Sequence, residues 1–449
     1  MSGVARQRGF MARAANTVVQ ALIAGVGRLD KSFSPAVTLT RLRKHHFTVS
    51  DSVYLFHIAN ATFWLFLMQV PGFPLKLMIP ALYTLALLVP FTSQFFIPAT
   101  PIFAWLITYY TSRFIPTAWR PTISVSLLPT LESVLYGANI SDILTRFTHP
   151  MLDIMAWLPY GVGHFTIPFF VAAFLWLFRS KEALHLWART FGYLNLFGVV
   201  IQILFPCSAP WYELIHGLTP ANYTMKGSPG GLARIDALLH SLAYSTAFSN
   251  APVVFGAFPS LHSACATLEA LFLAHFFPFT TRYVWVYAGV LFWATMYLTH
   301  HYLIDVVGGS CLSIAFFYLF LPDELRGDGA LAPPSNLSSA TQNRSKYEIY
   351  DLEAPRTAAM MDAADFDLSS DEEEVDITYR SPNPGVTPIS ATPLVKGGGV
   401  GTGRKNHRHT ASIASLIRGE ERSAEDGWSP VNAAFNVPAP RGAGRDAER

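Results

Sequence analysis

The chain has 449 residues, of which 51% are hydrophobic, 14% aromatic and only 14% charged. This composition excludes an ordinary soluble domain, in which about 25% of residues are charged. The net charge is only +2, and the sequence has no signature of nucleic-acid binding. The sequence has three cysteines, Cys207, Cys265 and Cys311, and we expect neither a disulfide framework nor a structural zinc site.

The first 50 residues are basic and lack the sustained apolar stretch of a cleavable signal peptide. The basic residues include Arg6, Arg8, Arg13, Arg41, Arg43 and Lys44. We therefore interpret residues 1–50 as a basic cytoplasmic segment, and we expect the apolar block that follows to serve as the membrane anchor.

Eight apolar blocks follow, and most approach the roughly 20 residues that a helix needs to cross a bilayer. They occupy residues 53–70, 75–95, 98–112, 152–178, 186–206, 260–279, 284–299 and 303–321. In lipid only helices and closed barrels satisfy all backbone hydrogen bonds. These blocks lack the alternation of apolar and polar residues that is typical of a barrel strand. We therefore predict an all-α polytopic membrane protein with about eight transmembrane helices and a catalytic domain at residues 51–322. The third block is short and contains Pro101, so residues 75–112 hold either one span or two.

Basic residues beside the spans predict the orientation, because they favour the cytoplasmic side. With eight spans they all fall on one side: Arg41, Arg43, Lys44, Arg179, Lys181, Arg282 and Arg326. Both termini are then cytoplasmic, and two long loops, residues 113–151 and 207–259, face the lumen or the exterior. The tripeptides that begin at Asn139 and Asn222 have the form of glycosylation acceptors.

After Leu321 the composition changes to Pro, Gly, Ser, Thr and charged residues. We interpret residues 323–449 as a disordered cytoplasmic tail. Serines beside the acidic run at 369–374 suit phosphorylation, and the basic cluster at 404–408 suits anionic lipid. The alternative is a solvated linker without either role.

Polar segments at the span ends are candidates for function, because burying such groups without a role is costly. They run from Arg113 to Pro121, from Phe258 to Ser263 and from Thr299 to Asp305. Two crossings separate each segment from the next, so all three lie at one membrane face. A shared face is a necessary condition for a single active site.

The second segment is typical of a helix start, because proline and serine favour the first turn. Ser260 can cap this helix, and we expect it to lie beside the reacting groups without reacting itself. His262 would then project from the first turn, where unpaired backbone N–H groups favour a phosphate.

The third segment places His301 and Asp305 four residues apart, so that on a helix they share one face. A carboxylate bonded to one imidazole nitrogen fixes the tautomer and leaves the other nitrogen more nucleophilic. The alternative is a His–Asp pair that only holds two helices together. His300 lacks such a partner, and we expect it and Tyr302 to support the site without reacting.

The first segment contributes Arg113 and Arg120, which we predict to bind a phosphate, because guanidinium groups bind phosphate oxygens bidentately and stay charged. The alternative is interfacial anchoring. Three loop charges, Lys226, Arg234 and Asp236, either contact the substrate head group or are solvated.

These segments resemble the motifs of the type 2 phosphatidic-acid phosphatase superfamily, K-x6-R-P, P-S-G-H and S-R-x5-H-x3-D. The matching stretches are Arg113-x6-Arg120-Pro121, Pro259-Ser260-Leu261-His262 and His301-x3-Asp305. Arginine replaces the lysine, leucine replaces the glycine, and Ala294-Thr295 stands where the Ser-Arg pair is expected. The resemblance implies a six-helix core of the phosphatidic-acid-phosphatase type.

The stretch from His301 to Val306 also resembles the His-Tyr-x-x-Asp-Val of sphingomyelin synthases. Residues 206–213, 255–263 and 299–302 look like fungal inositol phosphorylceramide synthases, a resemblance that runs from about residue 40 to 321. It implies transfer of phosphoinositol from phosphatidylinositol to the C1 hydroxyl of ceramide, with release of diacylglycerol, at the lumenal face of the Golgi. A regulatory membrane subunit is compatible with the resemblance.

The resemblance and the spacing together suggest a mechanism. His301, oriented by Asp305, would attack phosphorus and form a phosphohistidine, while His262 would protonate the departing alkoxide and later deprotonate the ceramide hydroxyl. Arg113 and Arg120 would offset phosphoryl charge. No stretch resembles a magnesium-binding carboxylate cluster, so we predict no metal and no cofactor. The alternatives are a lipid phosphate phosphatase with the same residues and a non-catalytic membrane lipid-binding protein.

Overall fold

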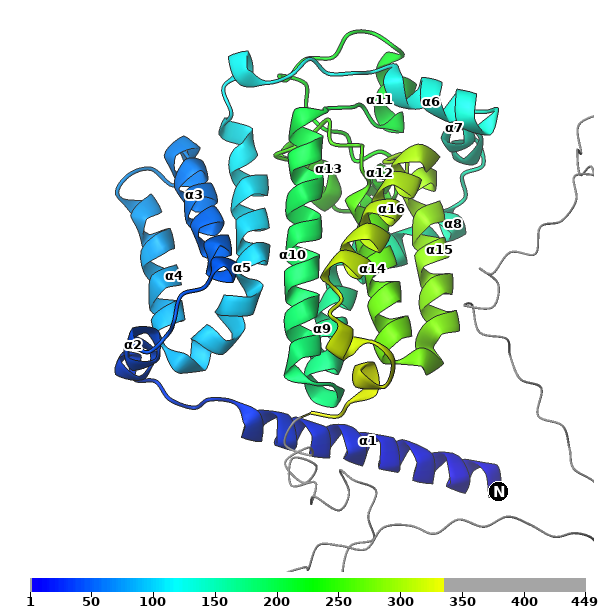
Figure 1. Cartoon of the computed structure of the whole chain (residues 1–449). Helices are drawn as coiled ribbons and strands as arrows, with labels where there is room; N and C mark the ends of the chain where they lie inside the picture. The colour runs from blue at the N-terminus through cyan, green and yellow to red at the C-terminus, as the bar shows by residue number, and fades with distance from the viewer. Residues whose placement is uncertain (1, 335–449) are drawn as a thin grey trace, which may run out of the picture. The chain divides into compact units, whose positions relative to one another are not determined.

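Helices are the regular elements of residues 2–334, the part of the chain that this computed structural model describes (Figure 1). Side chains are described from residue 12 onward. The acidic run and the basic cluster of the predicted tail lie outside the described residues. The predicted all-α class is confirmed.

Each of the eight apolar blocks is largely helical. The helices are α3 (Ser52–Leu67), α4 (Met78–Leu88), α5 (Pro90–Thr111), α9 (His164–Phe178) with α8 (Pro150–Trp157) before it, α10 (Lys181–Leu204), α14 (Leu261–Phe276), α15 (Thr281–Tyr297) and α16 (Leu303–Phe320). Within residues 2–334, three helical stretches are long and apolar enough to cross a membrane, namely Pro90–Phe114, Pro150–Phe178 and Leu303–Phe320. The chain is a multi-pass membrane protein.

The predicted boundary between the second and third blocks is wrong, because α5 begins at Pro90 rather than near residue 98. Val89 is extended, and Pro90 occupies the first turn of α5, where the missing N–H of a proline costs nothing. Residues 75–112 therefore hold two helices. A Cβ on Gly192 of α10 would lie 2.5 Å from the Ile102 backbone nitrogen, so this glycine lets α10 pack directly on α5.

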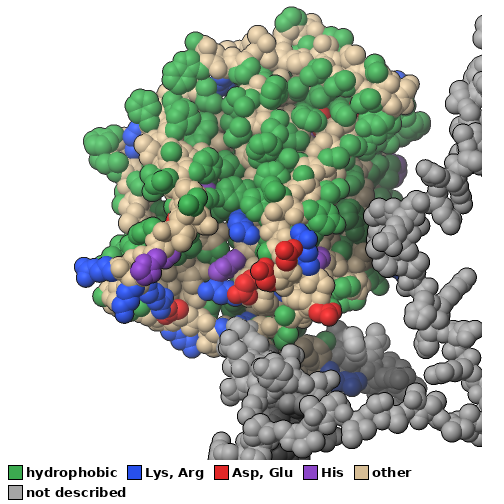
Figure 2. Space-filling view, in the orientation of Figure 1, with side chains coloured by type: hydrophobic (Ala, Val, Ile, Leu, Met, Phe, Trp, Pro, Cys, Tyr) green, Lys and Arg blue, Asp and Glu red, His purple; other side chains and the backbone are tan. Residues whose placement is uncertain are grey.

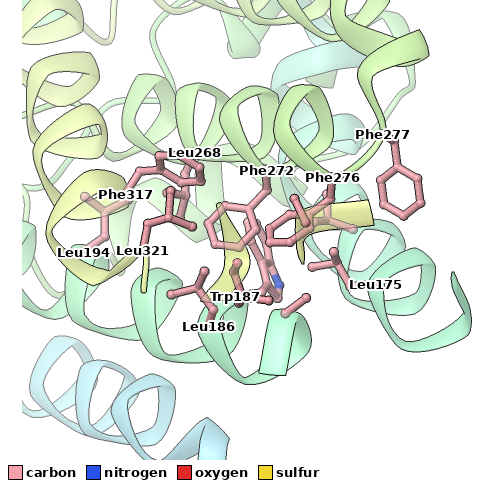
Figure 3. Close-up of a cluster of buried hydrophobic side chains, with 14 of the residues drawn as sticks. Leu175, Leu186, Trp187, Leu194, Leu268, Phe272, Phe276, Phe277, Phe317 and Leu321 are labelled. Carbon is pink, nitrogen blue, oxygen red and sulfur yellow. The ribbon is translucent and has the colours of Figure 1, made fainter. Parts of the chain in front are cut away.

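A large hydrophobic core joins α9, α10, α14 and α16 (Figure 3). Trp187 of α10 packs edge-on against Phe272 of α14, with ring centroids 4.9 Å apart, and Phe272 packs in the same way against Phe317 of α16 at 5.2 Å. Leu325 and Ala330 are buried in the same core. The packed part of the chain thus extends past residue 322.

The outer surface of the helices is strongly apolar. Phe66, Phe169 and Leu319 are each at least 75% exposed. Figure 2 shows hydrophobic side chains over most of one face, with charged and histidine side chains gathered near its lower end. A surface of this kind suits lipid, because apolar side chains in this number would be unfavourable in water.

Short helices from the two long loops form a cap at the opposite end of the helices from α2 (Figure 1). We use "cap" for α6 (Leu127–Tyr136), α7 (Ile140–Thr145), α11 (Pro210–His216), α12 (Leu232–Leu238) and α13 (Ala243–Ser249). An isolated bridge from Cys207 to Ser124 ties the two loops together, and a second bridge joins Cys207 to Gly256 within the later loop. The cap lies at the end where α14 and α16 begin.

The N-terminal segment is helical, which its composition alone did not indicate. It forms α1 (Ser2–Arg28) and α2 (Pro35–Arg43). The Arg28 guanidinium donates to the Trp176 carbonyl of α9 at 2.6 Å, so the end of α1 is attached to the helical bundle.

Candidate active site

The first turns of α14 and α16 lie side by side and are joined by hydrogen bonds. The Ser260 amide donates to the Asp305 carbonyl at 3.1 Å, and the Ser263 hydroxyl lies 3.0 Å from the Val306 carbonyl. The Ser260 hydroxyl accepts from the Ser263 amide, so the predicted cap of α14 is confirmed. Two motifs that are about 40 residues apart in sequence thereby become one local structure.

Gly309 of α16 makes this close approach possible. A Cβ at Gly309 would collide with the Ser260 carbonyl oxygen and the Ser263 hydroxyl, and it would lie 3.2 Å from the Ala264 nitrogen. Any larger residue would push α16 away from the start of α14. The position requires a glycine because of space, not because of an unusual backbone conformation.

The two predicted histidines are in direct contact. His301 Nε2 lies 3.3 Å from His262 Nδ1, and His301 Nδ1 lies 3.0 Å from the Ala257 carbonyl oxygen. A carbonyl only accepts, so Nδ1 of a neutral His301 carries the hydrogen and Nε2 keeps its lone pair. That lone pair, the nucleophilic one, points to His262.

Asp305 is fully buried beside His301, with Oδ2 at 3.7 Å from His301 Nδ1. The expectation that both residues share one helical face is wrong, because α16 begins at Leu303 and His301 precedes it. Tyr302 is extended, and its amide donates to Asp305 Oδ2 at 2.8 Å. Asp305 therefore caps α16 and brings negative charge close to His301 at the same time.

Two aromatic side chains that the sequence reading missed lie against His262. The Tyr160 ring stacks on it with centroids 4.2 Å apart, and the His164 ring lies at 4.4 Å. Both come from the π-helical segment Leu158–Gly163 or directly after it. Insertions of this kind in a helix are often found at functional sites. The available signal was a histidine directly after Gly161 and Gly163, inside an otherwise apolar block.

His300 forms another wall of the site. Its Nε2 lies 3.1 Å from the Pro229 carbonyl oxygen, and its ring stacks on Phe248 of α13 at 4.5 Å. Burial, with a smaller effect of the His301 charge, lowers the pKa of His300 to about 3. His300 is therefore neutral near pH 7, which does not suit an acid catalyst.

The two predicted phosphate-binding arginines do not contact the histidines. The Arg120 guanidinium donates to the carbonyls of Ile115 at 2.9 Å and Arg113 at 2.8 Å, and it lies 4.8 Å from the centroid of the Tyr223 ring. Arg113 packs in the same way over Tyr110, at 4.7 Å.

Both arginines line a cavity of about 510 Å³ together with Lys226. Its lining includes Gln69, Gln202 and Tyr223 but no aspartate or glutamate. The Gln202 amide donates to the Pro259 carbonyl at 3.0 Å, so the cavity wall is joined to the segment that carries His262. The cavity is thus cationic, and one residue of its wall is bonded to the segment that carries His262.

The other two loop charges make contacts within the protein. Arg234 pairs with Asp153 of α8 at 2.8 Å. Asp236 accepts from the amides of Tyr244 at 3.1 Å and Ser245 at 2.8 Å, at the start of α13. Burial tends to raise the pKa of Asp236, but these hydrogen bonds outweigh it and hold the pKa below its ordinary value.

The segment 206–213 reaches the site through several hydrogen bonds, among them one from the Trp211 amide to the Thr299 carbonyl at 2.9 Å. The Tyr302 hydroxyl donates to Glu213 Oε2 of α11 at 2.8 Å. Tyr302 is fully buried, and its ring packs in a cluster with Cys207 and Trp211. Tyr302 therefore links the cap to the residue next to His301.

Comparison with known proteins places this arrangement in a family. A family model described as the PAP2 superfamily matches residues 128–319, which include His262, His301 and Asp305 but not the two arginines. The fold and the paired histidines thus define a membrane enzyme of that superfamily.

The chain is 52% identical over 293 residues to the inositol phosphorylceramide synthase catalytic subunit of Schizosaccharomyces pombe. The aligned residues are 65% of this chain and 69% of that protein. It is 48% identical over 295 residues to the inositol phosphorylceramide synthase of Candida albicans, with 65% and 62% covered. It is 46% identical over 301 residues to the catalytic subunit of Saccharomyces cerevisiae, with 66% and 75% covered. The chain belongs to the inositol phosphorylceramide synthase family. No solved structure matches it significantly.

Proposed function

We propose that this chain transfers phosphoinositol from phosphatidylinositol to the C1 hydroxyl of ceramide and releases diacylglycerol. The observation that carries the proposal is the contact between His262 and His301, at 3.3 Å, in a chain about half identical to inositol phosphorylceramide synthases. Two adjacent imidazoles can supply both the nucleophile and the proton carrier that such a transfer needs.

In the first step, His301 Nε2 attacks the phosphorus of phosphatidylinositol. A nitrogen–phosphorus bond forms, the bond from phosphorus to the diacylglycerol oxygen breaks, and protonated His262 gives its proton to that oxygen. The products are diacylglycerol and a phosphoinositol group on His301. Asp305 stabilises the positive charge that develops on the attacking ring, since its Oδ2 is 3.7 Å from Nδ1.

In the second step, the ceramide C1 oxygen attacks the same phosphorus. His262, now neutral, accepts the hydroxyl proton, and the nitrogen–phosphorus bond breaks. Inositol phosphorylceramide leaves, and both histidines return to their starting protonation states. No net proton is taken up or released, so the two steps balance.

The phosphoryl group must come between the two imidazoles, because the lone pair of His301 Nε2 now points to His262. We propose that the two rings separate when the lipid binds. The cavity lined by Arg113, Arg120 and Lys226 is the proposed route and binding surface for the anionic head group, because it carries three cations and adjoins the His262 segment.

We also propose a Golgi membrane location with the site in the lumen and both termini cytoplasmic. The charged end of the molecule in Figure 2 lies opposite the cap, which agrees with the positive-inside rule. Residues 1–50 would be the cytoplasmic segment and 51–322 the catalytic domain, and the tail predicted for 323–449 would begin beyond the buried Leu325 and Ala330. The S. pombe relative is named a catalytic subunit, which supports a regulatory partner here too.

Reconstitution of the purified chain with labelled phosphatidylinositol and ceramide tests the proposal. We expect an inositol-containing sphingolipid, and release of free phosphoinositol alone would instead indicate a phosphatase-type hydrolase. With phosphate-labelled substrate and no ceramide, label should accumulate on the wild-type protein and be absent from His301→Ala. A folded His301→Ala variant with full activity would refute the phosphohistidine mechanism, whereas the absence of any product with the wild-type protein would favour a non-catalytic lipid-binding protein.

A further inference from the structure

A buried glutamate in the cap lies behind the proposed nucleophile. Glu132 is on α6 and is 0% exposed. Carboxylates are seldom fully buried unless they have partners, and the proposed transfer steps assign this residue no role. Its partners therefore indicate why it is there.

Those contacts reach the backbone of the two residues that flank Tyr302, namely the His301 carbonyl and the Leu303 amide. Glu132 Oε1 accepts from the Leu303 amide at 3.2 Å, at the first residue of α16. The Ser141 hydroxyl of α7 lies 3.3 Å from Glu132 Oε1 and 3.2 Å from the His301 carbonyl oxygen. Glu132 and Ser141 together hold the chain from His301 to Leu303.

The hydrogen bonds of the Ser141 hydroxyl distinguish the protonated form of Glu132 from the ionised form. The Ser141 hydroxyl has one hydrogen but faces two groups that accept, the His301 carbonyl and the Glu132 carboxyl. If Glu132 is protonated, its O–H donates to Ser141, and Ser141 donates to the carbonyl, so every contact is satisfied. If Glu132 is ionised, one of the two contacts joins an acceptor to an acceptor.

The surroundings favour the protonated form. Burial raises the pKa of Glu132 above its ordinary value; the hydrogen bonds from Leu303 and Ser141 oppose the shift, and the nearby Asp305 charge adds to it. The titratable groups that face Glu132 are Asp305 and Tyr302, and both are buried. An ionised Glu132 would place a second negative charge beside Asp305.

We propose that Glu132, as a hydrogen-bonded carboxylic acid, is a positioning residue for the transfer reaction. With Ser141 it holds the His301–Leu303 backbone so that His301 Nε2 keeps its direction toward the phosphorus. This inference rests on the proposed role of His301 as the nucleophile. Glu132 itself touches neither the lipid nor the reacting atoms.

Two substitutions at position 132 separate positioning from bulk stability. Glu132→Ala removes both contacts, whereas Glu132→Gln keeps them, because its amide donates to Ser141 and its carbonyl accepts from Leu303. We expect Glu132→Ala to lower kcat about tenfold or more with KM for phosphatidylinositol within about twofold, since a small misplacement of a reacting group has large effects. Glu132→Gln should stay within about threefold of wild type.

Asp142→Asn on the neighbouring helix is the matched control, because Asp142 pairs with the exposed Arg146 at 2.6 Å, away from His301. It should leave kcat unchanged. If Glu132→Ala does not fold, Ser141→Ala supplies the test, because it removes the contact to the His301 carbonyl and should also lower kcat. Wild-type kcat in a folded Glu132→Ala or Ser141→Ala variant, or a Gln variant as poor as the Ala variant, would overturn the inference.

His301→Ala, measured in the same assay, distinguishes a failure of the proposed mechanism from a failure of the positioning role of Glu132. An active His301→Ala protein would refute the proposed mechanism itself. An inactive His301→Ala beside a fully active Glu132→Ala would refute the positioning role and leave the mechanism in place.

Discussion

Gly309→Ala should separate the two halves of the active site with a single added carbon. A Cβ at this position collides with the Ser260 carbonyl oxygen and the Ser263 hydroxyl. The carbonyl belongs to the backbone before α14 and cannot rotate away. The two helices must therefore move apart, and His301 must move relative to His262.

The size of the effect follows from the contact distances. Restoring ordinary contact requires a separation on the order of 1 Å, and a displacement of that size at a reacting centre can cost about 100-fold in rate. This corresponds to about 2.7 kcal/mol in the activation free energy. Overpacking should also lower the free energy of unfolding by about 1–3 kcal/mol.

Gly289→Ala on α15 is the matched control, because a Cβ there meets nothing within 4 Å. The rate is measured as transfer of labelled phosphoinositol to ceramide. The stability is measured as thermal unfolding in detergent, with size-exclusion chromatography as the readout. We expect Gly289→Ala to match wild type in both measurements. A well-folded Gly309→Ala protein with wild-type kcat would show that the close approach of α14 and α16 does not set the histidine geometry.

Three further predictions concern charge and metal. Lys226→Ala should raise KM for phosphatidylinositol severalfold, since it removes one of three cations from the cavity, and an unchanged KM in lipid vesicles would exclude the cavity as head-group site. The pKa of His300 is about 3 in the fold and about 6.5 when unfolded, so the unfolded state binds the proton first and stability should fall as pH drops from 7 to 4. His300→Gln should flatten that slope in thermal unfolding measurements, and an identical slope would contradict the neutral assignment. No three His, Cys, Asp or Glu side chains are grouped for a metal in residues 12–334, whose side chains the structure describes. Activity should persist in excess chelator, and its loss would refute the metal-free mechanism.

Much of the fold could be predicted from the sequence, because the signals that specify it are local. An apolar run long enough to cross a bilayer is read directly from composition, and each of the eight runs is largely helical. The segments that hold His262 and His301 were also found locally, since proline, serine and histidine at a span end form a short pattern. The role of Ser260 as the N-cap residue of α14 follows from the same local rule.

What surrounds the histidines could not be predicted, because it depends on how distant helices pack. Tyr160 and His164 reach His262 from about 100 residues away, through a π-helical turn that no apolar pattern reveals. Ser141 was read as part of a glycosylation tripeptide, yet it is fully buried beside the His301 carbonyl. Glu132 gave no signal, because a glutamate in a short amphipathic helix normally faces water.

The predicted pairs show the same division. Spacing brought His301 and Asp305 together correctly but for the wrong reason, since the turn at Tyr302, and not a shared helical face, places the carboxylate at 3.7 Å. Spacing also grouped Arg120 with the histidines, whereas its guanidinium binds nearby carbonyls and faces a separate cavity. Sequence by itself determined the membrane class and the candidate reactive residues, because hydrophobic length and residue chemistry are properties of single segments. Tertiary structure decided their partners, because which side chains meet depends on how distant helices pack. At Gly309, for example, α16 approaches the start of α14 so closely that only a glycine fits.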